Sequence, residues 1–209
     1  MMNRMLKNVC RIGLTVCMVM GSMGTVWAQD ADAILKKTET VLRAAKGLSV
    51  SYTYKADGES GRGSIQMKGQ KFVNKMSGQT VWFNGETMWT LVKANEEVNV
   101  TTPTTAQIAA MNPYGFLAVY KNGYIAKTTT YSSQSEYVVT LTPKNKDKQN
   151  ITLKINRKSF LPTSVKVHHS TAGDIAISIT SIKTNQKYSD STFSFNSKAY
   201  PNYDVIDLR

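Results

Sequence analysis

The sequence predicts a mainly β (α+β) protein, with one large antiparallel sheet of ten or eleven strands and a few short helices. After residue 47, apolar and polar residues alternate in short runs separated by turn residues, as in strands joined by hairpins. Helical spacing is confined to residues 31–46 and to short stretches between 103 and 121. A sheet of this size curls or closes. We therefore expect an apolar cavity with the helices as its lid.

The N-terminal segment has the pattern of a secretory signal peptide. Arg4, Lys7 and Arg11 precede an uncharged, mostly apolar stretch over residues 12–26, and Val26-Trp27-Ala28 resembles a cleavage site. The apolar stretch is shorter than the roughly 20 residues that a membrane-spanning helix needs. We expect 1–28 to be cleaved and 29–209 to form a single exported domain.

Both cysteines, Cys10 and Cys17, lie inside this segment. Disulfides, thiol catalysis and Cys-ligated zinc are therefore not expected in the mature protein. Cys17 follows the bulky Val16, where a lipid-attachment signal has a small residue, so we expect a product that is not lipidated.

The first predicted element of the mature chain is a helix over residues 31–46. Asp30 or Asp32 can cap its start, and Gly47 stops it. One apolar stripe has helical spacing, and it consists of Ile34, Leu35, Thr38, Val41, Leu42 and Ala45.

The rest of the chain predicts strands, interrupted once. The Asn84-Gly85 turn between two aromatic-rich runs is among the strongest hairpin signals. Pro103 and Pro113 can open two short helices, over 104–111 and 114–121. A last strand over 192–195 leads to an irregular tail. The other strands are predicted over 50–55, 63–68, 72–76, 80–83, 87–93, 97–101, 124–131, 137–142, 150–156, 163–169 and 174–181.

The sequence offers few residues for catalysis. His168 and His169 are neighbours on a strand, so their side chains point to opposite faces. No close carboxylate pair stands out, and Gly61-Arg62-Gly63 lies between strands, where backbone geometry is its simplest use. We expect no enzyme, no cofactor and no metal site. A hydrolase of envelope lipids is the enzymatic alternative, and it would need one of these histidines.

The positive charge has two interpretations. The mature part holds all 14 acids and 23 of the 26 bases, a net charge of about +9. The lysines are spread over most turns and strand faces instead of forming one stripe, so we expect a solvated basic surface and no nucleic-acid partner. Weak attraction to anionic lipid headgroups is the functional alternative.

Apolar side chains concentrate between residues 65 and 91. Core packing explains any one of them, but methionine also suits surfaces that accept variable apolar ligands. The two interpretations coincide if the core surrounds a lidded cavity. The residues are Ile65, Met67, Phe72, Met76, Trp82, Met88, Trp89 and Leu91.

The run Trp82-Phe83-Asn84-Gly85-Glu86-Thr87-Met88-Trp89 resembles a signature of the periplasmic outer-membrane lipoprotein carrier family, LolA. Further similarities follow in the same order as in that family and cover nearly all of the mature chain. They are the helix at 31–46, the hairpin Gly61–Phe72, the segment Asn112–Leu117, the strand Val138–Lys144 ending in Thr-Pro-Lys, and the C-terminal stretch from Thr192 to Arg209.

The resemblance implies an unclosed β-barrel with a helical lid over a cavity that shields lipoprotein acyl chains. It also implies a monomeric periplasmic carrier that takes cargo from an inner-membrane ABC transporter and delivers it to the outer membrane, with or without a receptor there. Family members often carry an arginine latch for the lid. Lys68 is the candidate substitute here, although it lacks the planar guanidinium.

On this hypothesis the acyl chains contact apolar residues from both the sheet and the helices. A sensor of envelope lipids or lipoproteins on the same fold is the alternative. The expected cavity residues are Leu35, Val41, Leu42, Ile65, Met67, Phe72, Met76, Trp89, Leu91, Phe116 and Leu117.

Overall fold

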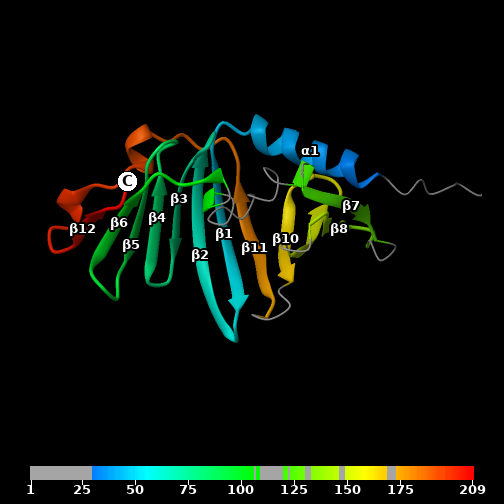
Figure 1. Ribbon diagram of the computed structural model, residues 1–209. Coiled ribbons are helices and arrows are strands. Elements are labelled where there is room, and N and C mark those ends of the chain that lie inside the picture. Colours follow the sequence, from blue (N-terminus) through cyan, green and yellow to red (C-terminus); the bar gives the residue numbers. More distant parts are fainter. Residues whose placement is uncertain are drawn as a thin grey trace, which may run out of the picture.

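The computed structural model describes residues 30–105, 107–108, 120–121, 123–129, 133–145, 149–168 and 173–209. Twelve strands in these ranges form one sheet in the order β12-β6-β5-β4-β3-β2-β1-β11-β10-β9-β8-β7 (Figure 1). The strands are β1 Leu48–Ala56, β2 Glu59–Lys68, β3 Lys71–Met76, β4 Gln79–Phe83, β5 Met88–Val92, β6 Glu97–Thr101, β7 Tyr124–Thr128, β8 Glu136–Pro143, β9 Asn150–Asn156, β10 Pro162–His168, β11 Ile175–Lys183 and β12 Asp204–Asp207.

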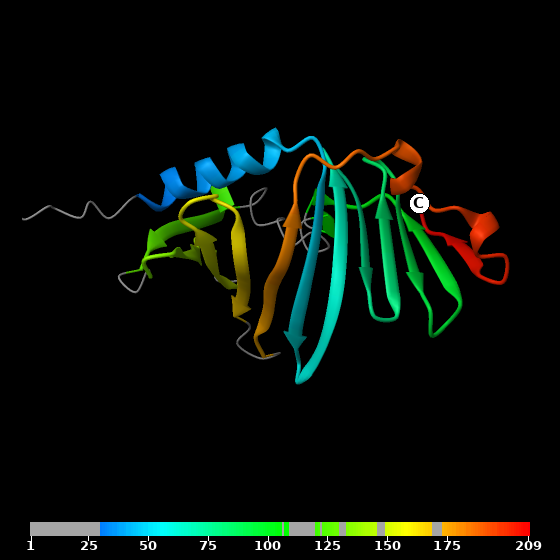
Figure 2. The ribbon, with the colours of Figure 1, turned by 180° about the vertical axis from the view of Figure 1, so that it is seen from behind.

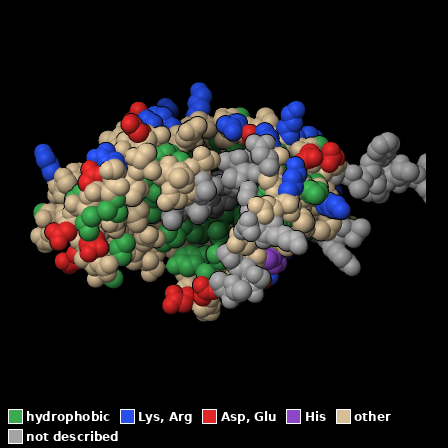
Figure 3. All heavy atoms as spheres, viewed as in Figure 1, with side chains coloured by type: hydrophobic (Ala, Val, Ile, Leu, Met, Phe, Trp, Pro, Cys, Tyr) green, Lys and Arg blue, Asp and Glu red, His purple; other side chains and the backbone are tan. Residues whose placement is uncertain are grey.

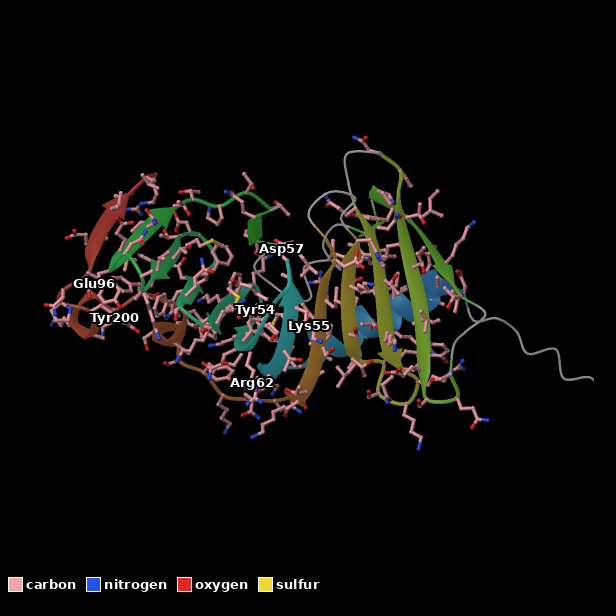
Figure 4. All side chains as sticks on the ribbon, turned by 90° about the horizontal axis from the view of Figure 1, so that it is seen from below. Tyr54, Lys55, Asp57, Arg62, Glu96 and Tyr200 are labelled. Carbon is pink, nitrogen blue, oxygen red and sulfur yellow. The ribbon has the colours of Figure 1, made fainter. Side chains whose placement is uncertain are left out.

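The sheet is almost wholly antiparallel and does not close into a barrel. Among the described strands only β12 and β6 pair in parallel, and β12 and β7 stand at opposite ends of the strand order. In Figure 4 the sheet bends so that β3–β6 and β7–β10 lie on either side of β1 and β11. The predicted fold class, an unclosed and mainly antiparallel curled sheet with a helix, is confirmed.

The pairing of β1 with β11 joins the two halves of the sheet. Both strands are nine residues long, and a bulge between Ser51 and Tyr52 shifts their register. Bulges increase the local twist of a sheet. This irregularity therefore lies where the sheet turns from one half to the other.

Helix α1, Ala31–Ala44, agrees with the predicted helix to within two residues. The Asp30 carboxylate accepts a hydrogen bond from the Asp32 backbone N–H at 3.2 Å and caps the first turn. Figures 1 and 2 show α1 across the ends of the β7–β10 half, far from β12. A Cβ on Gly47 would lie 2.2 Å from the carbonyl oxygen of Gln186, so glycine here also allows two backbones to approach.

The tail differs from the prediction. The 192–195 segment is not a strand, because η1, a 3-10 helix over Asp190–Phe193, and the residues after it pack on the sheet. The strand of the tail is β12, whose Asp204 N–H bonds to the Glu96 carbonyl at 2.9 Å. All four β12 residues are exposed. A strand with no buried face needs no alternation of apolar and polar residues, and the tail has no such pattern to predict β12.

Candidate functional site

The two faces of the sheet carry different cores. The face that we call the inner face carries Ile65, Phe72 and Leu153, and the apolar side of α1 packs on it through Ile34 and Leu35. The opposite, outer face carries a smaller cluster on β3–β6, which the tail covers. This outer cluster consists of Val73, Trp82, Leu91, Val98 and Phe193, with Trp89, Tyr188, Phe195, Tyr200 and Tyr203 packed against it.

Part of the inner face is apolar but only half-buried. We call it the apolar patch, and it comprises Tyr54, Met76, Val167, Ile177 and Ile179. The register makes it continuous, because Tyr54 pairs with Ile177 and Ile177 pairs with Val165 on β10. Figure 3 shows hydrophobic side chains in a recess at the centre of the same view as Figure 1, between the two halves of the sheet.

Two glycines shape the floor beside the patch. Tyr54 and Tyr52 of β1 stand opposite Gly61 and Gly63 of β2, and a Cβ on Gly63 would lie 2.4 Å from the Tyr52 ring. The missing side chains let both rings lie across β2, as aromatic residues do when they cover strand glycines.

The Tyr52 ring is held in place at its far end. Its hydroxyl donates to the Asn74 side-chain oxygen on β3 at 2.7 Å, and burial raises the pKa of this phenol. The hydrogen bond crosses β2 and ties β1 to β3. This bond therefore holds the Tyr52 ring in one position on the inner face, beside the apolar patch.

Most of the predicted cavity residues lie on the inner side. Met76 belongs to the apolar patch, and Val41 is half-buried on α1. Phe116 and Leu117 lie outside the described residues. Five others on the inner side are buried, and they form the base of the inner face and its contact with α1 instead of an accessible wall: Leu35, Leu42, Ile65, Met67 and Phe72.

Trp89 and Leu91 are placed differently from the expectation. The β4–β5 hairpin pairs Trp82 with Trp89 and Phe83 with Met88, so Met88 shares the inner face with Phe83. Because side chains alternate along a strand, Trp89 and Leu91 lie on the outer face, in the cluster beneath the tail. They are therefore not part of the site that we propose.

Lys68 is bound to the C-terminal tail, not to α1 as the lid hypothesis expects. Its ammonium group lies 3.0 Å from the Asp190 carboxylate and donates to the Tyr188 carbonyl at 3.2 Å. Lys71 binds the same carboxylate at 3.1 Å. These two lysines lower the pKa of Asp190 and fasten η1 to the outer side of β2 and β3. Lys68, which was predicted to hold the lid, therefore holds the C-terminal tail against the sheet instead.

A different ion pair connects α1 to the chain that precedes β7. The Glu39 carboxylate lies 2.7 Å from the Lys121 ammonium and 2.9 Å from Arg43. The hydrogen bonds from Lys121 and then Arg43 lower the pKa of Glu39. Tyr120 is buried beside this pair in the inner core. Nothing in the spacing of Glu39 and Lys121 along the sequence indicated this contact.

We expect the Glu39–Lys121 pair to make stability depend on pH. The folded pKa of Glu39 lies below its ordinary 4.5. Its contribution is therefore complete above the unfolded pKa and is lost as the pH falls through the lowered folded value. Glu39→Gln should lower Tm at pH 7 by no more than a few degrees, and by less near pH 3. A thermal melt series checks this. An equal Tm difference at both pH values would contradict the assignment, and Lys121→Gln should add nothing to Glu39→Gln.

His168 lies 3.3 Å from the Asp174 carboxylate and 3.1 Å from the Thr152 hydroxyl, while His169 falls outside the described part. Within the described ranges, no His, Cys, Asp and Glu side chains form a group of three or more that could hold a metal ion. None of the helices described is long and apolar enough to span a membrane.

A family model described as outer membrane lipoprotein carrier protein LolA matches residues 22–171. The chain belongs to this LolA family. A search of the curated proteins found no match. The family match spans α1, the apolar patch residues on β1, β3 and β10, and most of the sheet.

Solved structures were also compared with this LolA-family chain. A Thermus thermophilus protein described as uncharacterized and conserved has a TM-score of 0.58 at 9% identity, over 85% of this chain and 98% of that one. It shows a shared fold. A LolA superfamily protein from Nitrosomonas europaea has a TM-score of 0.44 at 12% identity, over 79% and 98% of the two chains. Mycobacterium tuberculosis lipoprotein LppX has 0.45 at 12%, over 76% and 98%.

Proposed function

We propose that this protein binds the acyl chains of lipoproteins on the inner face and carries them through the periplasm to the outer membrane. The observation that carries the proposal is the half-buried apolar patch around Tyr54, Met76 and Ile177 on a LolA-family fold. A continuous apolar patch that is only partly buried is typical of a binding site. The family description, that of a carrier, favours a binding protein over an enzyme.

The energetics show why such a carrier is needed. Each buried methylene contributes about 0.8 kcal/mol, so a single chain of ~15 methylenes costs about 12 kcal/mol to expose to water. A binding face that replaces water around part of the acyl chain lowers this free-energy cost while the lipoprotein crosses an aqueous compartment. The half-buried Met76 is adaptable in shape, and this suits chains of variable length.

The proposed carrier function implies particular partners and a location in the cell envelope. Cargo would come from an inner-membrane ABC transporter, and release at the outer membrane would use a receptor or the membrane itself. The mature protein would act as a periplasmic monomer without a cofactor. The predicted signal peptide over residues 1–28 supports export, and the family description supports lipoprotein cargo.

Binding of a triacylated peptide tests this proposal. We expect the mature protein to bind the triacylated peptide and not the same peptide without acyl chains, as measured by native mass spectrometry. We also expect it to move the triacylated peptide from donor to acceptor vesicles. Binding of free envelope lipids with no binding of the acylated peptide would favour the sensor alternative. Binding of neither would mean that the patch only packs the fold.

A further inference from the structure

Arg62, in the Gly61-Arg62-Gly63 motif, faces away from the apolar patch. Its two glycines make room for Tyr54 and Tyr52 on the inner face, so the alternation along β2 directs Arg62 to the outer face. Figure 4 shows Arg62 on the far side of the β1–β2 hairpin from Tyr54. The inner-face function proposed above therefore leaves this arginine without a role.

Arg62 borders a depression of about 410 Å³ on the outer face. Register pairs Thr53 with Arg62 and with Ser178, and it pairs Lys55 with Ser60 and with Ala176. These six side chains therefore share one face over three adjacent strands, β2, β1 and β11. Tyr54 and Gly61, which lie between these residues along β1 and β2, also line the depression.

The chemistry of the depression is that of an anion site. Lys55 and Arg62 are diagonal neighbours on β1 and β2, close enough for both to reach one ligand. Both are exposed, and neither forms an ion pair with a carboxylate of the described residues. Two cations held side by side repel, and an anion between them relieves the repulsion. Arginine matches the geometry of a phosphate group, and the Thr53, Ser60 and Ser178 hydroxyls are further donors.

The surroundings favour a broad negative surface as the ligand. Further bases share the outer face on nearby strands. Lys75 follows Val73 on β3, next to β2, and Lys154 alternates with the buried Leu153 and Ile155 on β9, two strands beyond β11. Asp174, just before β11, is already bound to Lys166 at 2.6 Å. A row of bases across a sheet face is attracted to a layer of anionic headgroups, and the attraction weakens with salt.

We propose that this depression binds the phosphate of an anionic phospholipid headgroup and docks the outer face on a membrane surface. The apolar patch stays on the other side of the sheet, free for cargo. The proposal goes beyond the carrier function, because docking requires no acyl chain to enter the protein. Its test uses vesicles without any lipoprotein, so the outcome is separate from that of the acyl-binding experiment.

Vesicle co-sedimentation of the mature protein tests the docking. We expect binding to vesicles that contain phosphatidylglycerol and little binding to pure phosphatidylcholine vesicles, with affinity falling as salt rises. The Lys55→Gln/Arg62→Gln variant should bind about tenfold more weakly or worse, since each base near an anionic surface contributes about a factor of five. Lys93→Gln/Lys198→Gln is the matched control, because it removes the same charge at exposed positions outside the depression.

Several results would overturn the docking proposal. An equal loss in both double variants would mean that only net charge matters. Binding of inorganic phosphate at Lys55 and Arg62, with no preference for anionic vesicles, would assign the site to a soluble phosphate compound instead of a membrane. If the first double variant fails to fold, Ser178→Asp replaces it, because a carboxylate at this exposed position should repel the headgroup. Unchanged vesicle binding by Ser178→Asp would then contradict the proposal.

Discussion

Ile177→Glu is expected to weaken binding of a triacylated peptide by at least about tenfold, because bound acyl chains would strip water from the new carboxylate. Ile177 lies at the centre of the apolar patch, opposite Tyr54, and is half-buried. The substituted side chain can remain hydrated in the unliganded protein, so the fold should survive. Titration of the acylated peptide, followed by native mass spectrometry, measures the loss.

Thr180→Glu is the matched control for Ile177→Glu. It adds the same charge to β11 at the exposed, unpaired residue of the bulge. We expect near wild-type affinity for this variant. Equal affinities for wild type and Ile177→Glu would remove the patch from the binding site. Phe72 is a poor probe for this purpose, because it is fully buried and its ring centroid lies 5.6 Å from that of Phe83.

Phe193→Ala is expected to destabilise the protein by about 3–5 kcal/mol, the usual cost of removing a buried phenylalanine. Phe193 is 0% exposed in the outer cluster, where it packs against Tyr188 at 5.8 Å between ring centroids. For a domain of this size the loss corresponds to a fall in Tm of roughly 10 °C. Thermal or urea unfolding measures it.

Tryptophan fluorescence is a suitable signal for the unfolding of Phe193→Ala. Trp82 and Trp89 both belong to the outer cluster, and the Trp82 ring lies 5.5 Å from that of Phe195. Lys198→Ala is the control, since Lys198 is exposed in the same segment. We expect it to unfold like the wild type. A Tm for Phe193→Ala close to that of wild type would mean that the tail does not hold the outer face.

Alternation predicted where the strands are but not which face each residue takes. Period two located nearly every strand through β11, and the Asn84-Gly85 signal located the β4–β5 hairpin. The loop between these strands runs from Asn84 to Thr87, and Asn84 binds the Thr87 N–H at 2.8 Å. That loop sets the pairing of Trp82 with Trp89 and so decides the face of Trp89. A single sequence does not reveal this register.

The long-range contacts were beyond sequence patterns. β12 forms because β6 presents a free edge to Asp204–Asp207, not because those four residues have a strand pattern. The aromatic residues of the tail, from Tyr188 to Tyr203, were the available signal that this segment covers something apolar. Likewise, Lys68 was expected to hold the lid, whereas its partner Asp190 lies 122 residues further along the chain.

Photo-cross-linking would show directly whether acyl chains lie on the inner face. A triacylated peptide with a diazirine near the end of one acyl chain would be bound to the mature protein, irradiated, and the adducts mapped by mass spectrometry. We expect adducts in peptides that contain Tyr54, Met76 or Ile177. Adducts confined to the outer-face segments around Trp89 and Phe195, or no specific adduct despite binding, would contradict this expectation.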